Sequence, residues 1–342
     1  MKPKQKFRLS DIADLAGVST ATVDRVLNRR PNVRALTAER VWEAYQKLKD
    51  TKLGQTLEER RIKFKGVIHC ILPSGAGPSI DENLKLALQA FGGHYERPVS
   101  FHFYRRIDPV AFSHAIEQAL NEGAGALVVL GIDHPSTTQR LSAIRATGMP
   151  VVSLLSNLSV SPQLSHVGMD NRAAGKTAGA LMGRFLRADE GEVAILCGSS
   201  MYQSHEDREM GFRAALRERC PSIRVLDVLA GKDGPEDNHY NVVDLIRCQP
   251  NLKGIYNVGS GNRGVVSALV ELGLERDIVV IAHNLTSSSR DYLISHAVDA
   301  IIHQNMNDVA RGAFELLAGS APATGSKIIR TEVILQENLP IE

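Results

Sequence analysis

The sequence predicts an all-α helix-turn-helix head followed by an α/β body that forms two doubly wound parallel-sheet lobes. Three observations lead to this prediction. Two short helical stripes joined by a Gly-containing turn lie near the N-terminus. From residue 66 onward, apolar runs typical of strands alternate with amphipathic stretches of helical length. The length of this second part favours two lobes over a single sheet.

Composition indicates a soluble protein. Apolar residues make up 43% of the 342 residues, which is enough for a substantial core. No apolar run is long enough to span a bilayer, and the opening "MKPKQKFRLSDIADLAG" lacks the apolar core of a signal peptide. We therefore expect a cytoplasmic protein without a membrane partner. The four cysteines are far apart and form no C-x-x-C pair, which favours reduced packing residues over metal ligands or disulfides.

Charge is distributed unevenly along the chain. Residues 1–65 contain 16 Lys and Arg against 8 Asp and Glu, a net charge of +8, so the rest carries −6 of the overall +2. A basic end on a mildly acidic body indicates a head that binds a polyanion. A solvated basic tail would show the same charge balance.

The helical pattern of the head distinguishes these two interpretations. Ile12, Ala13 and Ala16 share one helical face, and Val23, Val26 and Leu27 share another. Gly17 suits the tight turn between the two helices, and Ser19 suits the N-cap of the second. A third helix is predicted in "LTAERVWEAYQKL", with Thr37 as its cap.

The second helix has the side chains that a reader of the DNA major groove needs. Small residues at its start allow close approach to base edges, and Arg25 can pair bidentately with guanine. The arginines that follow are placed to contact phosphates. Asp24 is unexpected there, and either steers its neighbours or accepts from a cytosine amine. The predicted DNA contacts are Thr20, Ala21, Thr22, Arg25, Asn28, Arg29, Arg30 and Arg34.

The stretch "LSDIADLAGVSTATVDRVLN" resembles the head of the lactose-repressor (LacI/GalR) family of bacterial transcription regulators. The resemblance covers essentially the whole chain. It implies a DNA-binding head, a hinge, and a body like a type I periplasmic sugar-binding protein. On this basis we expect a head over residues 1–50, a hinge over 51–65 and an effector-binding and dimerisation body over 66–342.

The hinge departs from the family pattern. Members of the family usually carry a short helix with a leucine that wedges into the minor groove. Here Gly54 weakens such a helix, and Glu58 and Glu59 place negative charge near the DNA. Leu57 is the candidate wedge, with a simple linker leucine as the alternative.

Within the body, the chain is expected to cross between lobes three times, near "LSHVGMDN", "AIIHQN" and "IIRTEVIL". The first lobe is expected to hold about 66–162 and 291–322, and the second about 166–290 and 323–342. The stretch "GMDNRAAGKTAGALMG" closely resembles the opening of the second lobe in sugar-binding proteins. Asp170 within it is expected to cap a helix rather than contact a ligand.

A G-x-G-x-x-G pattern occurs at Gly259, Gly261 and Gly264. Dinucleotide sites need an acidic residue at the far end of the following strand. Asp277 is at the right distance but precedes that strand, so the pattern favours a pocket loop over a cofactor site. We therefore expect no cofactor. In this interpretation Asn257, Ser260 and Asn262 offer hydrogen bonds to a polar ligand.

The resemblance also implies positions that contact the effector. Arg208 matches an arginine that clasps hydroxyl or carboxylate groups, and its alternative role is a salt bridge to Glu206 or Glu209. Asn284 replaces the usual aspartate, which could shift preference towards an acidic or differently hydroxylated ligand. The remaining positions are Gln304 at a lobe crossing, Asp133 in the first lobe, and Ser74 after the first strand.

Enzymatic chemistry is not indicated. The histidines 205, 283 and 303 lie near strand ends without metal-binding spacing, and no nucleophile, base and oxyanion set is recognisable. We expect a non-enzymatic, metal-free, homodimeric regulator, of the repressor type, that binds a near-palindromic operator. A sugar, polyol or sugar acid between the lobes would control it. Alternatives are a transport binding protein, an NAD-dependent dehydrogenase, or a regulator controlled by a partner protein.

Overall fold

The chain divides into two compact units, Met1–Arg61 and Ile62–Glu342, which are described separately. The structure is a computed structural model. The expected hinge over 51–65 and its Leu57 lie outside the residues that it describes. Those residues are 9–28, 33, 37–38, 40–45, 66–74, 80–159, 164–186, 190–319 and 325–340.

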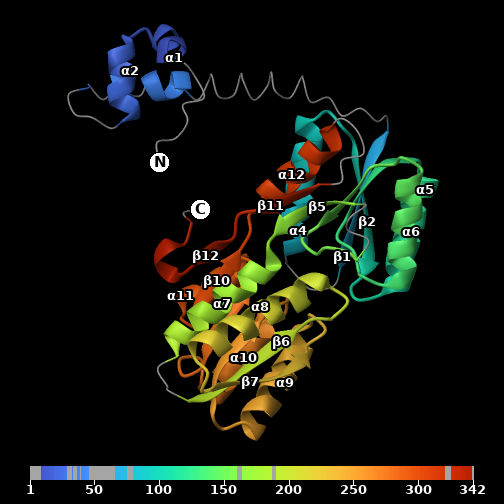
Figure 1. The fold of residues 1–342 in the computed structure, drawn as a ribbon, viewed down its shortest axis with the longest axis vertical. Helices are drawn as coiled ribbons and strands as arrows, with labels where there is room; N and C mark the ends of the chain where they lie inside the picture. The colour runs from blue at the N-terminus through green and yellow to red at the C-terminus, as the bar shows by residue number, and fades with distance from the viewer. Residues whose placement is uncertain are drawn as a thin grey trace. The chain divides into compact units, whose positions relative to one another are not determined.

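The first unit contains the predicted helix-turn-helix. Helix α1 (Leu9–Ala16) and helix α2 (Thr20–Leu27) are followed by helical residues 37–38 and 40–45 (Figure 1). Their apolar faces meet in one small core, because both helices repeat their apolar residues at helical spacing. The fully buried members of this core are Ile12, Ala13, Ala16, Val23, Val26, Val41 and Ala44.

The turn between α1 and α2 is built as its sequence predicts. Gly17 has φ +63°, a left-handed conformation that glycine adopts without steric cost. The Ser19 side chain caps α2 by accepting a hydrogen bond from the Thr22 backbone N–H at 3.2 Å. Arg40 closes the turn from the third helical segment, since its Nη2 donates to the Ala16 carbonyl at 2.6 Å.

The first lobe of the second unit is a six-stranded parallel sheet with the order β11-β5-β4-β3-β1-β2. Helices α4 and α12 cover one face and helices α5 and α6 the other (Figure 1). The strands are β1 (Val67–Ser74), β2 (Val99–Arg105), β3 (Ala124–Val129), β4 (Val151–Leu154), β5 (Ser165–Met169) and β11 (Ser326–Ile329). The helices are α4 (Ile80–His94), α5 (Pro109–Asn121), α6 (Pro135–Ala146) and α12 (Met306–Ala318).

The second lobe repeats this plan with the strand order β12-β10-β9-β8-β6-β7, in which only β12 runs antiparallel. Its strands are β6 (Gly191–Cys197), β7 (Ile223–Ala230), β8 (Leu252–Asn257), β9 (Val279–His283), β10 (Ala300–His303) and β12 (Glu332–Ile334). Its helices are α7 (Asn171–Phe185), α8 (Gln203–Arg219), α9 (Pro235–Cys248), α10 (Asn262–Leu272), α11 (Ser287–Ile294) and the short η2 (Gln336–Asn338).

The lobe boundaries were expected near residues 166, 291 and 323. The sheet that each strand joins shows that all three lie further along the chain. Strand β5 pairs with β4, so the first lobe continues to Met169. Helix α11 and strand β10 pack in the second lobe, so the chain returns only at Gln304. Strand β11 pairs with β5, which puts the last crossing between β11 and β12. The apolar pattern identified these strands but could not show which sheet each one joins.

The strand order decides where a ligand site can form. In each lobe the order reverses at the first strand of that lobe, β1 or β6, and ligands of open parallel sheets bind beyond the carboxyl ends of the strands at such points. The three crossings leave or enter the lobes at those same ends. No described helix is both long and apolar enough to cross a membrane.

Helices α7 and α8 pack unusually closely. A Cβ on Gly175 of α7 would overlap the backbone carbonyl of Arg208 on α8, and one on Gly211 would overlap the carbonyl of Arg172. These glycines therefore set the distance between the two helices, and with it the position of the Arg208 side chain.

Replacing Gly175 by alanine is expected to lower the free energy of unfolding by about 1–3 kcal/mol, the usual cost of overpacking, because α8 must move away from α7. Gly93→Ala in α4 is the matched control. A Cβ there meets nothing within 4 Å, so this change should be neutral or slightly stabilising. Denaturant-induced unfolding measures both. Equal effects of the two substitutions would contradict the close α7–α8 contact.

Candidate functional site

The outward face of α2 is open to a binding partner. Thr20, Ala21, Arg25 and Asn28 are exposed, and Thr22 is half-buried beside the cap. Arg25 makes no hydrogen bond or ion pair with any residue that the structure describes, so its guanidinium is available. Arg29, Arg30 and Arg34 lie outside the described residues.

Asp24 has a local role in this helix. Its carboxylate accepts a hydrogen bond from the Asn28 side-chain amide at 2.7 Å, one turn further on. Asn28 also caps the helix end, with its backbone N–H donating to the Asp24 carbonyl. Asp24 therefore orients Asn28, which is the first of the two roles considered for it.

The body contains a cavity at the carboxyl ends of the strands, where the two lobes meet. Its volume is about 50 Å³, smaller than the roughly 300–1,000 Å³ of typical small-molecule sites. From the first lobe it is lined by Arg106, Leu130, Leu155 and Ser156. From the second lobe and the crossings it is lined by Tyr202, Ser204, His205, Arg208, Asp233, Gly259, Ser260, Asn284 and Gln304.

An ion pair joins the lobes inside this cavity. Arg106, which follows β2, places Nη1 3.6 Å from the Asp233 carboxylate, which follows β7. Both side chains are largely buried, which strengthens their attraction. Asp233 is held from behind by the Ser260 backbone N–H at 2.8 Å. A Cβ on Gly259 would overlap the Asp233 carboxylate, so this glycine of the G-x-G-x-x-G pattern makes room for the acid.

Two further contacts tie the lobes together beside the cavity. The Ser204 backbone N–H donates to the Ser156 hydroxyl at 3.2 Å. The Asp133 backbone N–H donates to the Met201 carbonyl at 2.8 Å. The lobes are thus connected by polar contacts that hinge motion can make or break.

Arg208 is a second buried cation. Its Nε donates to Asn171 Oδ1 at 2.8 Å and its Nη1 to the Val258 carbonyl at 2.7 Å. Its Nη2 has no hydrogen-bond partner within the described part of the chain. The alternative of a salt bridge is not what forms, because Glu209 instead pairs with Arg213 at 2.7 Å. Burial lowers the pKa of Arg208, yet a guanidinium stays protonated at neutral pH.

Two polar atoms in the cavity wall lack a partner among the described residues. They are Nε2 of Gln304, a donor, and Oδ1 of Asn284, an acceptor. Gln304 is fully buried and fixed at its other end, where Oε1 accepts from the Met169 backbone N–H at 2.9 Å. Buried polar atoms without partners are rare in native proteins, so this donor and acceptor indicate a polar ligand.

His205 enters the cavity from the first turn of α8. Burial lowers its pKa to about 4, opposed by the nearby Asp233 carboxylate. The imidazole is therefore neutral at pH 7 and acts as a hydrogen-bonding group. Among the lining residues the charged groups are then two guanidiniums and one carboxylate, which leaves an excess positive charge for a ligand to meet.

Four of the eight predicted effector-contacting residues line the cavity: Arg208, Ser260, Asn284 and Gln304. The structure does not bring the other four into the lining, because each is engaged elsewhere. The Ser74 hydroxyl donates to the Tyr104 carbonyl, and the Asp133 carboxylate accepts from the backbone and hydroxyl of Ser159. The Asn257 side-chain amide donates to Asn262 Oδ1 at 2.6 Å and to the Ser260 carbonyl at 3.0 Å, within its own loop.

Arg106 and Asp233 are the main cavity residues that sequence reasoning missed. Both follow closely on predicted strands, and that position could have identified them. The expected cap is confirmed, since the Asp170 side chain accepts from the Ala173 backbone N–H at 2.8 Å.

Comparison with known proteins matches each of the two units to a family model. A family model described as periplasmic binding protein domain matches residues 79–321. The chain belongs to this family. Residues 8–49, before that match, correspond to the model of bacterial regulatory proteins of the lacI family. This match confirms the resemblance drawn from the head. The two-lobed family fold and the head are therefore combined in one polypeptide.

Similar curated proteins are named as HTH-type regulators. The HTH-type transcriptional repressor PurR of Actinobacillus pleuropneumoniae is 24% identical over 291 residues, 83% of each chain. The HTH-type transcriptional regulator MalR of Streptomyces coelicolor is 31% identical over 171 residues, 49% of this chain and 47% of the other. These family relatives are named as regulators of transcription rather than as enzymes.

Solved structures of other proteins share the fold of the body. The glucose-galactose binding protein GanP of Geobacillus stearothermophilus aligns with a TM-score of 0.71 and 18% identity, covering 81% of this chain and 100% of that one. A solute-binding protein from Burkholderia graminis in complex with D-arabinose aligns with a TM-score of 0.72 and 19% identity, covering 80% and 96%.

Buried histidines make this body sensitive to acid. Burial lowers the pKa of both His205 and His166 to about 4, whereas an unfolded histidine titrates near 6.5. Between these values the unfolded chain binds more protons, so each histidine stabilises the fold less as pH falls from about 6.5 to 4.

We expect His205→Gln to reduce the loss of unfolding free energy between pH 7 and pH 5, measured by denaturant titration without added ligand. His114→Gln, at an exposed position on α5, should leave that loss unchanged. A His205 imidazole that titrates near pH 6.5 in an NMR experiment would show that the site is not buried as described.

Proposed function

We propose that the protein is a DNA-binding regulator of transcription, of the repressor type, whose affinity for its operator is controlled by a small polar ligand in the inter-lobe cavity. The proposal depends on one observation above all. A lacI-type head and a cavity with unpaired buried polar groups occur in the same chain. A transport binding protein would need the cavity but not the head.

The head supports the DNA half of this proposal. The exposed start of α2 carries small side chains that permit close approach to base edges, followed by the exposed Arg25. Asn28, oriented by Asp24, adds a planar amide one turn later. We assign base or phosphate contacts to these exposed residues, together with Arg29, Arg30 and Arg34 as phosphate contacts.

The cavity supports a hydroxylated ligand, with a sugar acid favoured over a neutral sugar. Arg106 and Arg208 both line the cavity, and Nη2 of Arg208 has no hydrogen-bond partner in the described part of the chain. Gln304 and Asn284 supply one further donor and one further acceptor. Solved proteins of similar fold bind neutral sugars. The excess positive charge here favours a ligand that carries a carboxylate.

The crossings provide the coupling between ligand and head. Gln304 lies on the second crossing and accepts from Met169 at the first, so a ligand held by Gln304 contacts the hinge itself. Ligand binding that favours one lobe arrangement would change the spacing of two heads in a dimer. Couplings of this kind amount to about 1–3 kcal/mol, or about a 5- to 150-fold change in affinity.

The proposed regulator acts as a homodimer in the cytoplasm. Leu86 on α4 and Phe103 on the edge strand β2 are large apolar side chains left 64% and 47% exposed. Lys85 lies 5.5 Å from the Phe103 ring, so the two elements are adjacent there. An exposed apolar area of this kind favours an interface, and a two-fold dimer would present its heads to two half-sites.

Selection of bound duplexes from a random DNA library is expected to enrich a near-palindromic sequence, because two heads related by two-fold symmetry read equivalent half-sites. Arg25→Ala should lower the preference for that sequence over a scrambled one by about 1–3 kcal/mol in an anisotropy titration. Arg40→Ala, on the opposite side of the turn, is a control for loss of folding. An unchanged preference in Arg25→Ala would contradict its contact with bases.

Arg106→Ala is expected to weaken ligand binding by at least about tenfold, because it removes a charge-assisted hydrogen bond donor from the cavity. Neighbouring Arg105→Ala is the matched control, since Arg105 is exposed and pairs with Asp108 at the surface. A thermal-shift panel of D-galactose, D-arabinose, D-glucitol, D-gluconate and D-galacturonate identifies a ligand, and calorimetry then compares the variants. Equal affinity in both variants would place the ligand elsewhere.

A further inference from the structure

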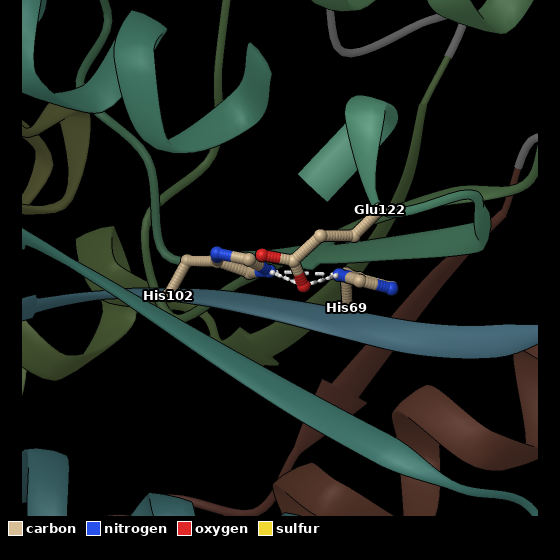
Figure 2. Close-up of side chains that lie close together, drawn as sticks. All are labelled: His69, His102 and Glu122. Atoms are coloured by element: carbon tan, nitrogen blue, oxygen red, sulfur yellow. Dashed lines mark hydrogen bonds and ion pairs between the residues drawn. The ribbon is translucent and has the colours of Figure 1, made fainter. Parts of the chain in front are cut away.

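Three side chains in the first lobe converge at a place that the proposed function does not use. His69 belongs to β1, His102 to the neighbouring strand β2, and Glu122 directly follows α5 (Figure 2). His69 lies near the amino end of β1, whereas the inter-lobe cavity lies beyond the carboxyl ends of the strands. Within the described residues this is the one group of His, Cys, Asp and Glu with the spacing of a metal site.

The two imidazoles are unusual components of this sheet. Both are buried, in strands that are otherwise rich in apolar residues. Their rings stack 5.0 Å apart, and His69 Nδ1 lies 2.7 Å from His102 Nε2. The two rings hydrogen-bond to each other through these nitrogens, whereas His69 Nε2 has no partner among the described residues. Burial of polar rings costs stability unless they gain partners.

Glu122 completes the group from the surface. Its Oε2 lies 3.6 Å from His102 Nε2 and 4.0 Å from His69 Nδ1, while its side chain remains 57% exposed. Figure 2 shows the carboxylate directed towards the facing nitrogens of the two rings. The turn that carries it is fixed, because Gly123 follows in a left-handed conformation with φ +79° and leads straight into β3.

We propose that His69, His102 and Glu122 form a binding site for a divalent transition-metal ion, with Zn²⁺ as the ion that this ligand set fits best. Two imidazole nitrogens and one carboxylate are ligands that Zn²⁺ uses, whereas Mg²⁺ and Ca²⁺ select oxygen ligands. Tetrahedral bonds of about 2.0–2.1 Å separate the ligand atoms by about 3.3 Å. The three observed separations differ from that spacing by less than 1 Å.

The surroundings make the site accessible and selective. The Glu122 carboxylate, at the surface, is the part of the group that solvent reaches. The fixed strand register, with His69 opposite Ser100 and His102 opposite Ile71, holds both rings on one face of the sheet.

Bound metal would link β1, β2 and the turn between α5 and β3. Such a link stabilises the first lobe by an amount that grows with the logarithm of the free metal concentration above the dissociation constant, since the unfolded chain does not hold the three ligands together. The site is independent of the inter-lobe cavity, so it can exist whether or not the proposed ligand control is correct.

The test uses the full-length chain without a histidine tag, stripped with chelator, in a Cys248→Ser background that removes the exposed thiol. Competition with a chromogenic chelator measures ZnCl₂ binding, and Co²⁺ absorption reports the coordination geometry. Glu122→Gln changes a surface side chain and should fold normally, while His102→Gln removes a ligand from the interior. His114→Gln, exposed on α5, is the matched control.

We expect one Zn²⁺ per chain that Glu122→Gln and His102→Gln weaken by at least about tenfold, with no change in His114→Gln. The Co²⁺ form should show the intense visible absorption of a tetrahedral site, without a thiolate charge-transfer band. Absence of Zn²⁺ binding to the parent chain would overturn the proposal. So would equal affinity in the parent, Glu122→Gln and His114→Gln chains, because the metal would then be bound elsewhere.

Discussion

The buried ion pair between Arg106 and Asp233 is the contact on which the arrangement of the body depends. It joins one residue from each lobe in a region of low dielectric, where charges must be paired to be tolerated. Arg208 adds a second buried cation without a second carboxylate beside it. Among the described residues, Gln304 Nε2 and Asn284 Oδ1 at the lobe interface have no hydrogen-bond partner, which is the condition under which a polar ligand gains most by entering.

The same contact explains why glycine occurs at two positions where the sequence alone gives no reason for it. Gly198 and Gly259 lack side chains because the Asp233 carboxylate occupies the space that a Cβ would fill. The first glycine of the G-x-G-x-x-G pattern therefore makes room for an acidic side chain, whereas Gly261 and Gly264 make room for Asn238 and for the Pro235 carbonyl. Gly175 and Gly211 similarly allow α7 and α8 to approach, which sets Arg208 at the cavity. Ordinary steric requirements of one charged site account for several glycines that lie far apart in the chain.

Local patterns predicted the elements well and the assembly less well. The Gly17 turn, the Ser19 and Asp170 caps and the α/β alternation follow from rules that act over a few residues. Lobe boundaries depend on which sheet a strand joins, and β5 and β11 carry no local signal for that choice. Half of the predicted contact residues line the cavity. Asn257 and Asn262 do not, because Asn257 donates a hydrogen bond to Asn262 instead. Arg106 and Asp233 were not predicted, because they meet only after the lobes come together.

The central claim is that occupancy of the inter-lobe cavity and DNA affinity of the head are linked. The most direct test titrates the homodimer onto its selected operator by fluorescence anisotropy, with and without a saturating concentration of the ligand found by thermal shift. The account predicts that the dissociation constant for DNA changes by about 5- to 150-fold. The same dissociation constant at both ligand concentrations would contradict it.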